Sequence, residues 1–227
     1  MDSVLLRRAV LVGLASGIVA SCATQTKTST FYIDDGVTTS LRHESSRGVA
    51  VERGFTHPTQ ISSERLSDML VSIVIRSKDG DTFVEKQAIA SELVAGIARG
   101  LSASFAAAKS SEEIALVAVR RERRLGVFTK KYLTSFVAFT SGNELTVSLA
   151  RVEWDTARDR QSRGKRNKLP QPHLGRKVME FRVVPRDGYA AVGEQMARFD
   201  LSHPRWDVAA VETPTSGSAT TDAVPLH

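Results

Sequence analysis

The pattern of apolar and polar positions predicts one long amphipathic helix over residues 85–108. Large apolar side chains recur every four residues through this segment, at Ile89, Leu93, Ile97, Leu101 and Phe105. A stripe at this period forms one face of a helix. Gly96 and Gly100 lie four residues apart on the same helix, and each costs about 1 kcal/mol against alanine. We therefore expect them to let its backbone approach a sheet or a neighbouring helix closely.

Shorter apolar runs predict strands before and after this helix. Residues 69–75 read MLVSIVI and end at a Ser-Lys-Asp-Gly turn, which favours a buried strand, although continuation of a preceding helix stays open. Ser62 or Ser63 is placed to cap that short helix. Residues 114–119 (IALVAV) predict a second buried strand, and residues 178–184, ended by a proline, a further one. Residues 31–33 and 49–51 are weaker strand candidates.

Two alternating runs, 134–139 and 145–154, flank the sequence Ser-Gly-Asn-Glu and predict a β-hairpin. In the second run the apolar parity changes near Arg151, which indicates a bulge or a strand that leaves the core. The order of elements is strand, long helix, strand, hairpin, strand. It predicts an α+β fold in which one long helix packs on a mostly antiparallel sheet.

The N-terminus has the three parts of an export signal. Arg7 and Arg8 precede an uncharged apolar stretch, 9–20, which is too short to span a bilayer. The stretch ends at Val19-Ala20-Ser21-Cys22. This arrangement resembles the lipobox of bacterial lipoproteins. The resemblance implies cleavage before Cys22, a diacylglycerol on its sulfur, and a further acyl chain, typically palmitate, on the new amino group. Two or three acyl chains anchor a protein durably.

The resemblance also carries a localisation. Ala23 stands where an aspartate would retain such lipoproteins at the inner membrane, so the pattern is that of an outer-membrane lipoprotein facing the periplasm. Cys22 is the only cysteine, so the chain forms no internal disulfide. The expected organisation is a signal peptide (1–21), a flexible tether (22–30), one α+β domain (31–211) with a basic loop (157–177), and a disordered tail (212–227) that is rich in small and polar residues.

Positive charge is concentrated in two clusters. The whole chain carries a net charge of +6. Four arginines between residues 120 and 124 form the first cluster, with Lys130 and Lys131 close behind. The second cluster is the basic loop, which follows Trp154. Each cluster is either a solvated surface or a docking surface for an anionic envelope component. The candidate partner-binding residues are Trp154, Arg158, Arg160, Arg163, Lys165, Arg166 and Lys168. Trp154 equally fits a residue that closes the rim of the core.

The sequence contains no recognisable catalytic or cofactor motif. It lacks a Gly-x-Ser-x-Gly elbow, a His-Glu-x-x-His zinc motif and a phosphate-binding loop. No metal and no cofactor is expected, and a glycosidase with distant carboxylates stays a minor alternative. The main hypothesis is a non-enzymatic, lipid-anchored accessory protein, a scaffold or subunit of a cell-envelope assembly. Its partners would be the membrane, through the lipid, and envelope proteins or anionic envelope components. Nucleic acid is not expected. The alternative is a binding module for an anionic glycan or lipid, and an envelope hydrolase is weaker.

Overall fold

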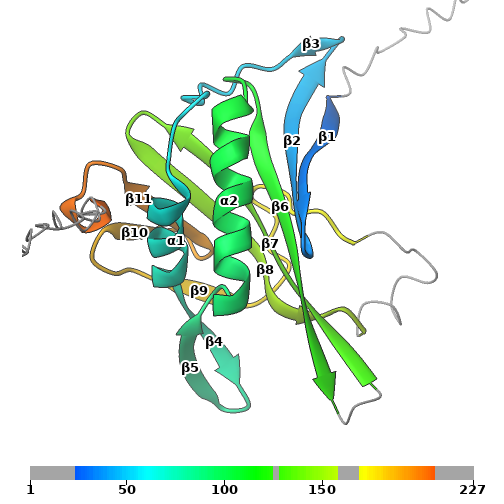
Figure 1. Cartoon of the computed structure of the whole chain (residues 1–227), viewed down its shortest axis with the longest axis vertical. Coiled ribbons are helices and arrows are strands. Elements are labelled where there is room, and N and C mark those ends of the chain that lie inside the picture. Colours follow the sequence, from blue (N-terminus) through cyan, green and yellow to red (C-terminus); the bar gives the residue numbers. More distant parts are fainter. Residues whose placement is uncertain (1–23, 125–127, 158–168, 208–227) are drawn as a thin grey trace, which may run out of the picture.

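The fold is dominated by one large antiparallel sheet. We describe residues 24–124, 128–157 and 169–207 of a computed structural model (Figure 1). Seven strands lie in the order β1-β2-β6-β7-β8-β11-β10, and β3 adds to β2. Every pairing is antiparallel. The strands are β1 (Gln25–Asp34), β2 (Val37–Ser46), β3 (Val49–Ala50), β6 (Glu113–Arg124), β7 (Phe128–Ser141), β8 (Glu144–Asp155), β10 (Tyr189–Val192) and β11 (Met196–Asp200).

Two helices cover one face of the large sheet, and the β4–β5 hairpin of a second, smaller sheet projects below them (Figure 1). The helices are α1 (Ser63–Ser72) and α2 (Ser91–Ala107), and a short 3-10 helix, η1, spans Pro204–Trp206. The smaller sheet has the order β5-β4-β9, with β4 (Val74–Asp79), β5 (Thr82–Gln87) and β9 (Phe181–Val184). The core between these layers contains fully buried side chains from both helices and from the large sheet, including Leu66, Met69, Leu101, Phe105, Leu116, Phe136 and Val147.

The predicted arrangement of one long helix on a sheet is wrong. The described residues contain two helices and two antiparallel sheets, and strands outweigh helices. The predicted helix over 85–108 begins only at Ser91, because residues 85–87 pair with β4 as part of β5. The predicted strand over 69–75 is divided: α1 includes Met69 and ends at Ser72, and β4 begins at Val74.

The structure confirms four local predictions: a helix cap, a close contact at a glycine, a hairpin turn and a β-bulge. Ser62 caps α1, because its hydroxyl accepts a hydrogen bond from the backbone N–H of Arg65 at 3.2 Å. Gly100 brings α2 against the sheet, where a Cβ would lie 2.9 Å from the ring of Tyr32. The β7–β8 hairpin turns at Gly142, whose φ is +58°. The β7–β8 register shifts opposite residues 149–151, which is the predicted bulge near Arg151.

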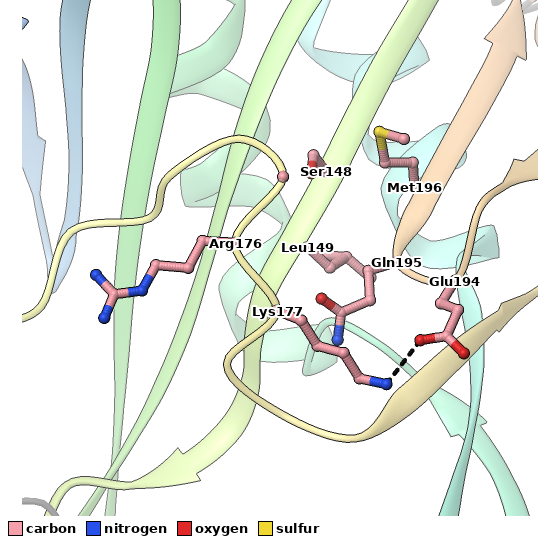
Figure 2. A pocket seen from close by; sticks show the side chains of 8 residues that line it. Ser148, Leu149, Arg176, Lys177, Glu194, Gln195 and Met196 are labelled. Carbon is pink, nitrogen blue, oxygen red and sulfur yellow. Dashed lines mark hydrogen bonds and ion pairs between the residues drawn. The ribbon is translucent and has the colours of Figure 1, made fainter.

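The second face of the large sheet is also covered. Val117 on β6, Val137 on β7 and Ala150 on β8 are buried, yet they do not belong to the core beneath the helices. The segment 169–180 crosses this face, and it appears as the yellow trace that passes in front of β8 in Figure 2. Its contacts include the sulfur of Met179, which accepts a hydrogen bond from the N–H of Val152. Both faces of the central strands are therefore buried.

The N-terminal part of the predicted organisation needs a correction. Residues 25–30, which are predicted to belong to a flexible tether, form the first part of β1 and pair with β2 from Gln25↔Ser45 onward. Their polar side chains stay exposed, because an edge strand can be held by its backbone hydrogen bonds alone. The predicted signal peptide, Cys22 and the predicted tail 212–227 lie outside the described residues. Among the described helices, none has the length and apolar character needed to cross a membrane.

Candidate functional site

The two faces at the end of the β6–β7–β8 ribbon differ in net charge. On the side of the helices, charges of both signs are paired. Arg120 lies 3.5 Å from Glu92 of α2 and 2.9 Å from Glu153 of β8, and its guanidinium stacks on the ring of Tyr132. Glu153 also lies 3.6 Å from Lys86 of β5. This face is therefore close to neutral.

The other face of the same strands carries an uncompensated row of cations. Alternate residues of a strand point to opposite faces, so Arg121 and Arg123 point away from Arg120 and the helices. In the β6–β7 register Arg121 stands directly opposite Lys131, and directly opposed residues share a face. Arg123 stands opposite Thr129. We call Arg121, Arg123 and Lys131 the basic ladder. Within the part of the chain that the structure describes, none of the three lies within ion-pair distance of a carboxylate.

Trp154 lies at the base of this ladder. It pairs with Leu133 across the β7–β8 ribbon and so shares the face of the ladder. The guanidinium of Arg151, a buried residue, lies 4.9 Å from the centre of its ring. Trp154 is half-buried, and the cation occupies one approach to its ring. The ring is thus held in place by the protein itself.

Arg158, Arg160, Arg163, Lys165, Arg166 and Lys168 lie outside the described residues. Of the candidate set, the structure places Trp154 alone. Ala157, the last residue described before that stretch, lies two residues beyond the end of β8, a strand of the sheet that carries the basic ladder.

A second polar cluster lies at the opposite end of β6, beneath the segment 169–180. The buried Arg42 donates to Glu113 at 2.7 Å and 2.5 Å and to the carbonyl of Pro172. Arg53 lies 3.9 Å from the other oxygen of Glu113. A cavity of about 390 Å³ opens beside them, lined also by Thr26 and His173. Burial, then Arg42, lowers the pKa of His173. The cluster holds the segment on the sheet, and its charges are largely matched.

A smaller hollow of about 200 Å³ lies farther along the same segment (Figure 2). Lys177 bonds Glu194 at 2.7 Å across its floor, and Arg176 points away from it. The Lys177 ammonium lowers the pKa of the Glu194 carboxyl. Ser148 and Leu149 of β8 form the back of the hollow. Because the lysine and the glutamate neutralise each other, we assign this hollow a structural role.

Among the edge strands that the structure describes, β5 and β1 carry large exposed apolar side chains. In β5 all six residues are exposed, and Phe83 keeps 72% of its surface accessible. In β1 the exposed apolar residues are Phe31 and Ile33, the latter 74% accessible. Among the described residues, β5 pairs only with β4, and β1 only with β2. Open edges with exposed apolar side chains are features of surfaces that receive another protein.

The histidines and acids that the structure describes do not converge on one site. His57 is buried against Phe105, and the side chain of His203 accepts a hydrogen bond from Arg205 at the start of η1. His43 lies 3.8 Å from Glu112. No group of three potential metal ligands occurs within the described ranges.

The chain matches no protein-family model, and neither the curated proteins nor the solved structures include a significant match to it.

The basic ladder was only partly visible in the sequence. The arginine cluster and Lys131 are evident there, but as one charged group. The available signal was alternation: a strand that contains Arg-Arg-Glu-Arg-Arg places Glu122 on one face and Arg121 and Arg123 on the other. The position of Lys131 opposite Arg121 depends on the hairpin register, which the sequence alone did not provide.

Proposed function

We propose that this protein is a lipid-anchored accessory subunit of a cell-envelope assembly, and that it binds an anionic component of that assembly through the basic ladder. The observation that carries the proposal is the pairing of Arg121 with Lys131. Like charges directly opposite each other on a sheet are destabilising, by up to about 1 kcal/mol. The helix side of the same strands avoids this cost with Glu92, Glu122 and Glu153. The repulsion between Arg121 and Lys131 is kept on the face away from the helices. We take this as support for an anionic partner that binds there and offsets the repulsion.

The anchor of the proposal is Cys22. The lipobox resemblance supports acylation there, and an outer-membrane position facing the periplasm follows from Ala23 in the same way. Mass measurement of the natively expressed protein tests this part. A chain that begins at Cys22 and carries diacylglycerol supports it, and an intact N-terminal methionine or an unmodified Cys22 thiol contradicts it.

Lys131→Glu is expected to stabilise the protein and weaken binding at the same time. The free energy of unfolding should rise by about 0.5 kcal/mol, because the change turns a repulsive pair with Arg121 into an attractive one. Affinity for poly-L-glutamate, used as a polyanionic probe at low salt, should fall about tenfold, which corresponds to about 1.4 kcal/mol. Urea denaturation and a binding titration measure the two effects.

Lys130→Glu is the matched control. It changes the net charge equally, but Lys130 stands opposite Glu122 on the helix side of the ribbon. We expect a small loss of stability and a weaker effect on binding. If both variants bind poly-L-glutamate equally, net charge alone governs binding and the ladder is not a site. The wild-type protein should also bind poly-L-glutamate much more weakly at physiological salt than at low salt, because exposed charges are screened within about 8–10 Å.

The alternative function, a binding module for an anionic glycan or lipid, has one favourable observation, which is the position of Trp154 beside the ladder. Sugar recognition of this kind uses an open aromatic face. Since Arg151 stacks on this ring, we rank the glycan module second.

A further inference from the structure

The start of β1 fixes which end of the domain is nearest to the proposed lipid anchor. Two residues, Ala23 and Thr24, separate Cys22 from Gln25, so three Cα–Cα steps join them. An extended chain spans at most about 3.6 Å per residue, so the lipidated cysteine lies within about 11 Å of the first residue of β1. The turn between β2 and β3 lies at the same end of the sheet. Ser45 pairs with Gln25 on one side and with Ala50 of β3 on the other, and the turn begins just after it. Val49, the first residue of β3 after this turn, is 72% exposed.

The basic ladder occupies the opposite end of the sheet. Glu113, the first residue of β6, pairs with Arg42 of β2. Arg42 in turn pairs with Thr28, so β6 begins level with the fourth residue of β1. From there β6 runs on to Arg123 and Arg124. At about 3.3 Å per residue, Thr129 lies roughly 40 Å from the start of β1 along the strands. Figure 1 shows the same arrangement, with β1 beginning at the top and the β6–β7 ribbon projecting at the bottom.

A domain lying flat on its β1 edge would bring the ladder back towards the membrane. That orientation also presses the turn between β1 and β2 against the lipid surface. Asp34 at this turn is paired with Arg99 at 3.0 Å, but its neighbour Asp35 is exposed and is within ion-pair distance of no cation among the described residues. Anionic headgroups repel the Asp35 carboxylate. The upright orientation instead places Val49 and Lys27 near the membrane, where an apolar side chain and a cation are favourable.

We infer that the domain stands upright on its lipid anchor and presents the basic ladder, away from the anchoring membrane, to an acidic protein surface. The inference rests on the proposed function and adds the direction and the class of the partner. Distance disfavours the headgroups of the anchoring membrane as the ligand. Arg151 occupies one approach to the half-buried ring of Trp154, which leaves less aromatic surface for a glycan. The ladder spaces its cations as neighbours in a sheet, about 5 Å across the strands and 7 Å along one of them, which suits carboxylates on a protein surface.

Energy transfer in vesicles tests the orientation. Because the thiol of Cys22 would be a thioether, a cysteine introduced in the lipidated protein is the only reactive one. Val49→Cys, Ile33→Cys and Thr129→Cys each receive a donor fluorophore, and the lipidated chain is reconstituted in phosphatidylcholine vesicles that contain acceptor-labelled lipid. Transfer should be strongest from position 49, weaker from 33 and weakest from 129. Transfer from position 129 equal to or above that from position 49 overturns the inference.

The same preparation tests the partner class. Adding 30% phosphatidylglycerol should leave transfer from position 129 unchanged, and an increase that Lys131→Glu abolishes would identify lipid as the ligand instead. In solution the ladder should bind poly-L-glutamate more tightly than polygalacturonate of equal charge, and the reverse order excludes an acidic protein partner. Failure of the proposed function has a different signature, since an unlipidated chain does not associate with vesicles at all.

Discussion

Gly188→Ala is expected to lower the free energy of unfolding by about 3 kcal/mol. Gly188 has a φ of +86°, a region that costs an L-residue roughly 1–2 kcal/mol. A Cβ there would lie 2.3 Å from the ring of Trp206, which is 1% exposed. The ring cannot retreat freely, because it packs edge-on against Phe199 and donates a hydrogen bond to the Gly188 carbonyl at 3.1 Å. Overpacking of this kind adds typically 1–3 kcal/mol.

Gly193→Ala separates backbone strain from collision. Gly193 also has a positive φ, +63°, but the nearest atom to its Cβ is the methyl of Met196 at 3.9 Å. We expect a loss of only about 1 kcal/mol. Urea denaturation of both variants gives the comparison, and a red shift of tryptophan emission in Gly188→Ala alone reports the displaced indole. Equal losses in the two variants would mean that the Trp206 contact contributes nothing.

Acid is expected to destabilise the protein between pH 6.5 and 4 through His57. Burial beside Phe55 and Phe105 lowers the pKa of His57 to about 4, against an ordinary value of 6.5, and Glu112 opposes the shift weakly. In this window the unfolded chain binds a proton that the folded chain does not. The stabilising contribution is therefore complete above pH 6.5 and is lost as the pH falls towards 4. A shift of this size corresponds to up to about 3 kcal/mol.

His57→Phe should remove most of this dependence. Phenylalanine keeps the contact with Phe105 and does not titrate, so the unfolding free energy of the variant should change less than that of the wild type between pH 6.5 and 4. His173, whose pKa is also lowered, acts in the same direction, and His173→Gln provides the second control. An unchanged pH profile in His57→Phe would show that the buried imidazole is not the titrating group.

The boundary between α1 and β4 shows what the sequence could not determine. The seven apolar residues from Met69 fit either element, because a short run without polar positions has no readable period. The structure divides the run at Ile73. Met69 and Leu70 complete the helical face that begins at Leu66, and Ile75 faces the core from β4. Cap chemistry at Ser62 was local and therefore predictable. The helix C-terminus depended on the strand that β4 joins.

The smaller sheet was missed for a related reason. Glu85 and Lys86 resemble the charged first turn of an amphipathic helix, and their partners are distant in sequence. Arg76 and Arg186 hold Glu85 at 2.5 Å and 2.7 Å. Only tertiary pairing with β4 makes this segment a strand. By contrast, Gly96 and Gly100 could be interpreted correctly, because the cost of two glycines in one helix requires a close approach whatever lies opposite.

The candidate site was predictable in composition but not in geometry. Trp154 and the arginine cluster at 120–124 are evident in the sequence, whereas their relation to each other depends on strand parity and register. The covered second face of the sheet left a signal that could have been used. Residues 114–118 are apolar at every position, as in a strand that is buried on both sides.

The position of β1 at the edge of the sheet affects the order of events during biosynthesis. On the proposed lipidation, the enzymes that trim and acylate Cys22 need access to a stretch that ends three residues before the first strand. The side chains of Gln25 to Thr30 are exposed, so opening this part of β1 uncovers none of the apolar core. Such terminal fraying needs little free energy. The remainder of the domain can thus fold early, and residues 25–30 can pair with β2 after the fatty chains are attached.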